Sequence, residues 1–118
     1  MSNGDLEKAR KTFRGHGYTV VILGLVSLLF ISGASEKLVA ATVVGIGFCV
    51  VTGIWLVVRP AVRIGVAAGV SLTVLGILDM LLALETGAGL AIVAPLIDWG
   101  YAVVVFVGCR RYARALAG

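Results

Sequence analysis

Charged side chains are scarce in this chain and almost absent from its interior. The 118 residues include only 10 Lys or Arg, 6 Asp or Glu and 1 His. Apolar residues make up 60% of the chain, and its mean hydropathy is +1.09. A soluble domain of this size needs a polar surface that this composition cannot supply. The lack of charge therefore excludes a soluble globular domain and predicts an integral membrane protein.

Residues that carry catalysis or bind metals are also scarce. The single histidine, His16, cannot build a haem or quinone site of the usual kind. The sequence contains no phosphate-binding glycine loop, no cluster of metal ligands and no Ser/His/Asp set. We therefore expect no enzyme activity, no cofactor and no bound metal. The two cysteines, Cys49 and Cys109, are predicted to lie about 15 Å apart in depth, too far for a disulfide.

Four long apolar runs take up most of the chain. They cover residues 18–34, 38–58, 64–84 and 89–109, and the short breaks between them contain charge, Pro or Gly. A hydrocarbon core about 30 Å thick needs about 20 apolar residues of helix. The alternating strands of a membrane barrel are not present. We predict an all-α integral membrane four-helix bundle, and we expect the first run to be a span rather than a cleaved signal peptide.

The basic residues predict which way the bundle faces. Four spans put both ends and the middle connection on one side, and nine of the ten Lys and Arg residues lie in those segments. Because positive residues stay in the cytoplasm, we predict a multi-pass protein of the cell (inner or plasma) membrane with both termini cytoplasmic. The nine residues are expected to contact anionic lipid headgroups, so the net charge of +4 requires no nucleic-acid partner. They are Lys8, Arg10, Lys11, Arg14, Arg59, Arg63, Arg110, Arg111 and Arg114.

Two basic tails flank the predicted transmembrane domain of residues 18–109. Residues 1–17 have acids early and bases later, as a helix dipole favours. We predict that they form an amphipathic helix on the cytoplasmic membrane surface, with Leu6 and Phe13 turned inward. His16 is expected to be a solvated residue at the interface rather than a ligand. Residues 110–118 are predicted to form the second cytoplasmic tail.

A weak internal repeat appears when the chain is displaced by 52 residues. The stretch "ILGLVSLL" then lies over "VLGILDML", with Ser27 in the place of Asp79. Two tandem helical hairpins explain this match, and so does chance, because Gly, Leu and Val are common here. The first hairpin resembles repeats of the HdeD-type family of small bacterial membrane proteins in its glycines, Gly24, Gly45, Gly47 and Gly53. That family has more spans and a Pro in the outer turn; the resemblance implies a role linked to acid stress and no catalytic residues.

Small residues predict where the helices pack. Apolar area cannot drive helix association inside lipid, so close approach depends on small side chains. Helical spacing gives one small-residue stripe on each of the last three runs. These are Ala41, Gly45 and Thr52; Gly65, Gly69, Gly76, Asp79 and Ala83; and Ala91, Ala94, Pro95, Asp98 and Ala102. The bulky face of the fourth run, which includes Trp99 and Phe106, is expected to face lipid.

Two aspartates lie within the predicted spans. Asp79 is about 9 Å and Asp98 about 15 Å below the outer surface by helical rise. Side chains lean toward the start of their own helix, so the two carboxyls lean toward each other. Pro95 frees the carbonyl of Ala91 as a neighbouring acceptor, and Tyr101, one turn on, could complete a polar cluster. The carboxyls must be protonated, share a proton, hold a cation or meet a cationic partner.

Two functions fit these features. In the first, the protein is a structural or accessory subunit of a homo-oligomer or of a larger membrane complex. In the second, it is a minimal proton- or cation-linked transporter or channel that works as an oligomer through Asp98 and Asp79. Four helices of this length cannot easily enclose a pathway alone, so the first function asks less of the sequence.

Overall fold

The computed structural model describes residues 3–31, 33–87 and 89–117, and every regular element in these ranges is a helix. Residues 1, 2, 32, 88 and 118, which include the ends of both predicted tails, lie outside the described residues. The predicted all-α fold of four long helices is confirmed, and each is long and apolar enough to cross a membrane. In chain order the elements are α1 (Asn3–Val26), the 3₁₀ helix η1 (Ser27–Phe30), α2 (Glu36–Val58), α3 (Val62–Thr86), the 3₁₀ helix η2 (Gly89–Ile92) and α4 (Val93–Ala117).

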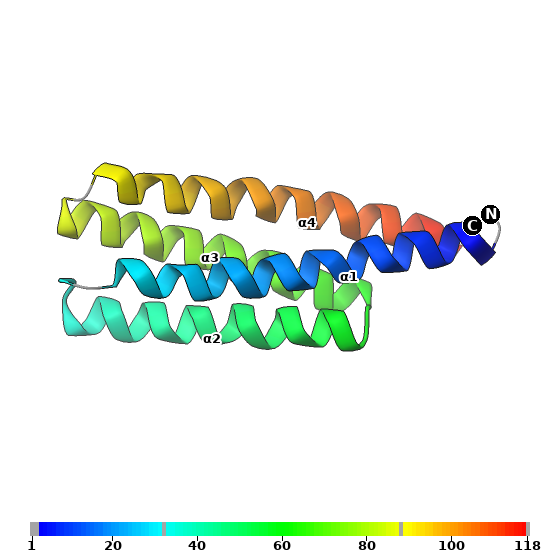
Figure 1. The fold of residues 1–118 in the computed structure, drawn as a ribbon, viewed down its shortest axis with the longest axis horizontal. Helices are drawn as coiled ribbons and strands as arrows, with labels where there is room; N and C mark the ends of the chain where they lie inside the picture. The colour runs from blue at the N-terminus through cyan, green and yellow to red at the C-terminus, as the bar shows by residue number, and fades with distance from the viewer. Residues whose placement is uncertain (1–2, 32, 88, 118) are drawn as a thin grey trace.

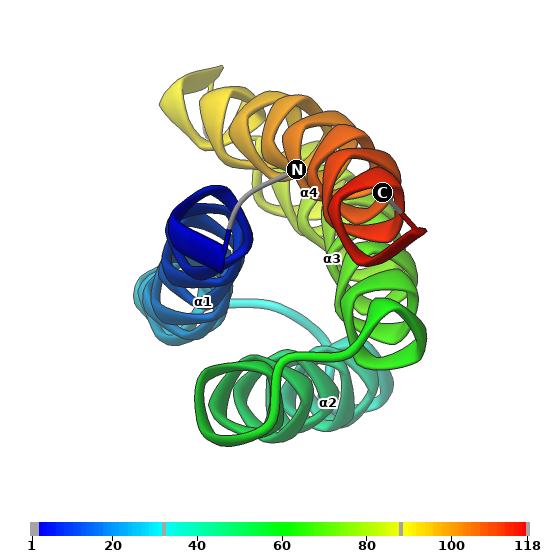
Figure 2. The ribbon, with the colours of Figure 1, turned by 90° about the vertical axis from the view of Figure 1, so that its right-hand side faces the viewer.

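The helices form an elongated bundle with extents of 52 × 21 × 16 Å. The α1–α2 and α3–α4 turns lie at one end, which we call the turn end. Both termini and the α2–α3 connection lie toward the other, the terminal end, where α1 and α4 extend beyond α2 and α3 (Figure 1). Seen along the axis, the helices follow one another around a ring, so that α1 and α3 lie on a diagonal (Figure 2). All the basic segments therefore lie toward one end of the molecule.

Local chemistry explains where the helices end. Gly33 and Gly87 have φ values of +85° and +69°, a left-handed conformation that glycine adopts without a Cβ clash. Pro60 follows α2 and has no backbone N–H to continue it. At the turn end, the Ser35 N–H that precedes α2 donates to Glu85 Oε1 at 2.9 Å. This bond joins the two turns.

The N-terminal segment is not a separate surface helix. α1 runs without a break from Asn3 through the predicted boundary at Tyr18 to Val26. Phe13, which was expected to face the membrane, is 1% exposed and stacks on Tyr112 with ring centroids 4.6 Å apart. The predicted tail after residue 109 is likewise helical to Ala117. The two predicted tails pack against each other, because each supplies apolar side chains that the other covers.

The outer surface of the bundle is apolar. Leu29, Val58 and Leu84 are 76%, 68% and 67% exposed, and similar side chains cover every long helix. The buried core is a narrow column of medium-sized side chains that includes Val20, Leu56, Leu72, Leu75 and Val105. Such a surface suits lipid, which solvates apolar side chains as well as a protein core does.

Glycines set how closely the helices approach. A Cβ on Gly17 of α1 would lie 2.6 Å from the carbonyl oxygen of Gly53 of α2, so these two backbones touch. A Cβ on Gly69 of α3 would lie 2.7 Å from the ring of Phe106, and one on Gly76 would overlap Trp99. The prediction that the bulky face of the fourth run is exposed is therefore wrong for Trp99 and Phe106, whereas its other members, Ile92, Leu96 and Val103, are 40%, 56% and 62% exposed. Glycine leaves a notch on α3 at each position, and each notch holds an aromatic ring of α4.

The other predicted packing residues divide between the interior and the surface. Gly45 and Gly65 are buried, and a Cβ on Gly65 would overlap Phe13 and approach Cys109. Ala41 is exposed, so it does not contribute to packing within the chain. The two cysteines are both buried, and both are free thiols rather than a disulfide, as predicted.

Candidate functional site

Three polar side chains meet inside the bundle and form what we call the acid cluster: Ser27, Asp79 and Asp98. They come from η1, α3 and α4, and they are 2%, 1% and 2% exposed. Ser27 lies on η1, which directly follows α1, and Asp79 lies on α3. The two side chains therefore face each other across the diagonal of the ring. A buried acid needs a hydrogen-bond partner or a neutralising charge, so the contacts of this cluster decide what it can do.

Ser27 supplies the first contact. Its hydroxyl donates to Asp79 Oδ2 at 2.9 Å, and the carbonyl oxygen of Leu23 lies farther away, at 3.3 Å. The single hydroxyl proton therefore favours the carboxyl group. Ser27 and Asp79 are 52 residues apart, so the two positions that the 52-residue displacement aligns are in contact.

The two carboxyl groups supply the second contact. Asp79 and Asp98 are buried neighbours on the packed helices α3 and α4, as the opposite directions of their helices predict. Two carboxylates have no proton to share, so a hydrogen bond between them requires that at least one is protonated. Asp79 Oδ1 and Asp98 Oδ2 are buried and have no partner in the described part of the chain. The cluster is thus only partly satisfied.

A pocket of about 310 Å³ reaches the acid cluster from the side of the bundle. One wall of the pocket is the last turn of α1 together with η1, and the other wall is the first turns of α4. Ser27 and Asp98 form its polar lining. Val26, Val93 and Ile97 line it as well and are 40–50% exposed, so the pocket opens on the outer surface. A side chain or small molecule can approach Asp98 from this direction.

Tyr101 does not belong to the acid cluster. Its hydroxyl shares a hydrogen bond of 2.9 Å with His16 Nδ1, between α4 and α1. His16 is half-buried and also packs edge-on against the rings of Phe13 and Tyr101. His16 is therefore only half-exposed rather than fully solvated, because α4 covers one side of it at Tyr101 and Gly108.

Pro95 is buried, as its place on the small-residue stripe predicts, and it also marks the start of α4. The fourth run starts as η2, and α4 begins only at Val93. Pro95 therefore lies in the first turn of α4, where backbone N–H groups have no helical partner and a proline costs no hydrogen bond. Asp98 follows in the second turn. Proline here helps to start α4 rather than to break it.

The nine basic residues lie in the segments at the terminal end, in the extensions of α1 and α4 and beside the α2–α3 connection. Eight are exposed and Arg10 is half-buried. Arg10 Nε donates to the Tyr112 hydroxyl at 3.2 Å, so this residue also holds α1 to α4.

Sequence reasoning missed two site residues. Ser27 could have been found from the 52-residue offset, which already aligned it with Asp79. His16 had no such signal, because its partner Tyr101 is 85 residues away. Among the described residues no group of three His, Cys, Asp or Glu side chains could hold a metal ion. No family model, no curated protein and no solved structure matches this chain.

Proposed function

We propose that this chain is a four-span protein of the cell membrane, with both termini in the cytoplasm, and that it serves as a non-enzymatic accessory subunit of a larger membrane complex. The four apolar helices and their apolar outer surface support the membrane location. The position of nine basic residues toward the terminal end supports the orientation. The lipid bilayer is then its first partner.

One observation supports the accessory role. Asp98 lines a pocket that opens toward the proposed lipid, and its Oδ2 atom lacks a donor. Acyl chains carry no hydrogen-bond donor, and intramembrane acids normally face a partner helix. A donor side chain from a neighbouring helix that enters between α1 and α4 and displaces the side chains covering Asp98 would satisfy this buried oxygen.

We take the donor to be cationic, because a cation would also neutralise a buried acid. This sequence has no Lys, Arg or His between His16 and Lys37, between Lys37 and Arg59, or between Arg63 and Arg110. A second copy in the same orientation therefore brings hydroxyl and indole donors but no cationic side chain to the depth of Asp98. We assign the donor to a Lys, Arg or His side chain on a transmembrane helix of another membrane subunit.

Cross-linking from the pocket tests this role. A photoreactive amino acid at Ile97, on the pocket rim, is expected to capture one partner in a fixed ratio, through a helix that carries a donor side chain. The same group at Val44, which is 59% exposed on α2, serves as the control. Asp98→Leu should lower the Ile97 cross-link about 3- to 30-fold, the effect of one membrane hydrogen bond of about 0.6–2 kcal/mol. Equal capture from Ile97 and Val44, or an unchanged yield in Asp98→Leu, would contradict the accessory role.

A proton- or cation-linked function is the second candidate, and the contact between the two carboxyls favours it. Two neighbouring buried carboxyls that share a proton beside an open pocket would form a proton-binding site. Such a site would agree with the acid-stress role that the HdeD-type resemblance implies. Asp98→Asn should then abolish ion flux in liposomes while the fold survives. Difference infrared spectroscopy should show a protonated carboxyl band near neutral pH that Asp98→Asn removes; its absence from the wild-type protein would contradict the shared proton.

A labelling experiment tests the orientation. Cysteine introduced at Thr86, beside the α3–α4 turn, should react with a membrane-impermeant reagent added outside, and tags at either terminus should be accessible only from the cytoplasm. The control replaces Cys49 and Cys109 with Ala, so that only the new thiol reacts. Labelling of Thr86→Cys from the cytoplasmic side alone would reverse the proposed topology.

A further inference from the structure

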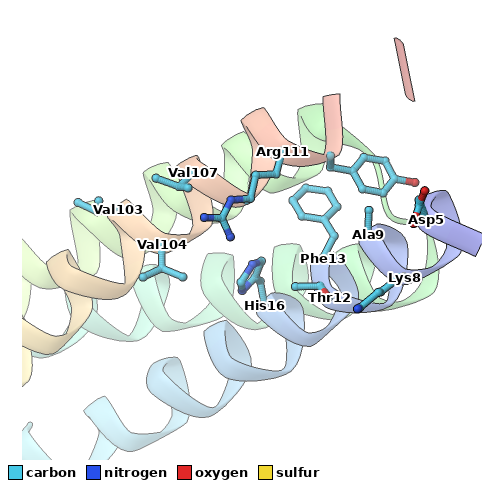
Figure 3. Close-up of a pocket in the computed structure, with 12 residues that line it drawn as sticks. Asp5, Lys8, Ala9, Thr12, Phe13, His16, Val103, Val104, Val107 and Arg111 are labelled. Carbon is cyan, nitrogen blue, oxygen red and sulfur yellow. The ribbon is translucent and has the colours of Figure 1, made fainter. Parts of the chain in front are cut away.

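A second groove lies on the α1–α4 face, at the terminal end, between residues 5–16 of α1 and residues 103–112 of α4 (Figure 3). We propose that this groove binds one anionic phospholipid, with the phosphate at Lys8 and Arg111 and an acyl chain along the valines of α4. The inference rests on the proposed membrane location, and it is independent of the role of Asp98.

The groove has a volume of about 530 Å³ and two chemically different parts. Lys8, Thr12 and Arg111 line its polar part. Val103, Val104 and Val107 line its apolar part and are 62%, 44% and 42% exposed. In Figure 3 the valines lie at one end of the groove and Lys8 and Asp5 toward the terminal tip, while Arg111 lies between them with its guanidinium beside His16. The groove thus presents polar and then apolar groups in the order in which a lipid carries its headgroup and its chains.

Aromatic packing forms the floor of the groove. Phe13 is buried and stacks on Tyr112 across the two helices. His16 lies against α4 where Gly108 leaves room, since a Cβ at Gly108 would be 2.8 Å from the His16 ring. The His16–Tyr101 hydrogen bond joins the helices beside this floor. These contacts hold α1 and α4 together beneath the groove, so it is part of the fold without a ligand.

The charges favour a phosphate. Lys8 projects from α1 and Arg111 from α4, so the two walls each supply one cation. Arginine binds phosphate oxygens through two N–H groups and lysine as a point charge. Asp5 is the one acid in the lining, and in Figure 3 it lies at the opposite end of the groove from the valines. Basic pockets between transmembrane helices recognise anionic headgroups in this way.

The chain provides a matched pair of variants. Lys8→Gln with Arg111→Gln removes both cations from the groove. Lys11→Gln with Arg110→Gln removes the same charge from exposed neighbours that do not line it. Each protein is reconstituted in nanodiscs of equal parts phosphatidylglycerol and phosphatidylcholine, its incorporation is measured, and retained lipid is counted by native mass spectrometry.

Wild-type protein and the Lys11/Arg110 variant should each retain one phosphatidylglycerol, and the Lys8/Arg111 variant should retain it at least about tenfold less. Val103→Trp, which fills the apolar part without changing charge, should also lose it. Equal loss in both double variants would show general attraction to the membrane surface and overturn the proposal. So would loss on adding millimolar glycerol phosphate, because the groove would then bind a headgroup alone. Failure to enter nanodiscs would instead contradict the proposed membrane location, and with it the lipid site.

Discussion

The two hairpins of the bundle place glycine at equivalent positions and use it differently. Gly17 and Gly24 of α1 lie 52 residues before Gly69 and Gly76 of α3. In the first hairpin Gly17 meets the backbone of Gly53, so that main chain touches main chain. In the second, Gly69 and Gly76 hold the rings of Phe106 and Trp99. Glycine thus brings two backbones together at Gly17, whereas a Cβ on Gly24 would lie 3.1 Å from Cys49 Cβ, and Gly69 and Gly76 make room for rings.

The hairpins also differ in polarity. The first has Ser27 and Ile46 where the second has Asp79 and Asp98. The Phe106 ring can shift to admit a small change, whereas Trp99 is held by its hydrogen bond to Thr73 and the Gly17–Gly53 contact joins two backbones. The comparison indicates that the α3–α4 hairpin, which carries the acids, is more adaptable at Gly69 than the α1–α2 hairpin is at Gly17.

The largest effect is expected where the backbones touch. Gly53→Ala should lower the free energy of unfolding by about 2–3 kcal/mol, because the new methyl group meets the Gly17 carbonyl and the helices must separate. Unfolding by SDS in mixed micelles measures it. Gly47→Ala in the same helix, where no atom lies within 4 Å of a Cβ, should be neutral or stabilising. Similar losses in both variants would remove the distinction between the hairpins.

A larger side chain in a notch should also disrupt packing. Gly69→Leu must expel the Phe106 ring and is expected to cost about 1–3 kcal/mol. Val70→Leu changes an adjacent residue that is 51% exposed and should cost less than about 0.5 kcal/mol. Native gels and SDS titration compare the two. Gly69→Ala sharpens the test. The Phe106 ring should accommodate a methyl group at position 69 better than the Gly53 backbone accommodates one at position 17.

The hydrogen bond between Ser27 and Asp79, which links the two hairpins, is expected to contribute less to the free energy of unfolding. Ser27→Ala removes the hydroxyl that donates to Asp79 and should cost about 1 kcal/mol. Ser71→Ala is its control, because the Ser71 hydroxyl bonds only within its own helix, to the carbonyl of Ala67. If the two variants unfold at the same SDS fraction, the diagonal contact does not join the hairpins.

The smallest effect is expected at Trp99. Its Nε1–H donates to the carbonyl oxygen of Thr73 at 3.1 Å, and Trp99→Phe keeps an aromatic ring while it removes this bond. We expect a loss of about 0.6 kcal/mol, the average for a membrane hydrogen bond. Trp55→Phe, at a ring that is 54% exposed, should change the unfolding free energy by less. A greater loss at Trp55 would contradict the packing of Trp99 in a notch.

Sequence reasoning found the features that depend on depth and periodicity. Residue counting along two opposed helices was enough to bring Asp79 and Asp98 together, and helical spacing was enough to turn Gly65, Gly69 and Gly76 inward. It failed where a side chain's partner is set by tertiary packing. The expectation that bulky residues face lipid misplaced Trp99 and Phe106, because notches on another helix decide their environment.

The contacts that close the α1–α4 face have a consequence for the order of folding. His16 bonds Tyr101 and Arg10 bonds Tyr112, across 85 and 102 residues. A growing chain can pair α1 with α2 as soon as both exist, but these bonds must wait until Tyr101 and Tyr112 of α4 have been made. Among the four long helices, the α1–α4 face is therefore the last to close during synthesis. The pocket of Asp98 and the groove of Lys8 and Arg111 both lie on it, so the proposed ligands would have their widest access to these sites before α4 packs.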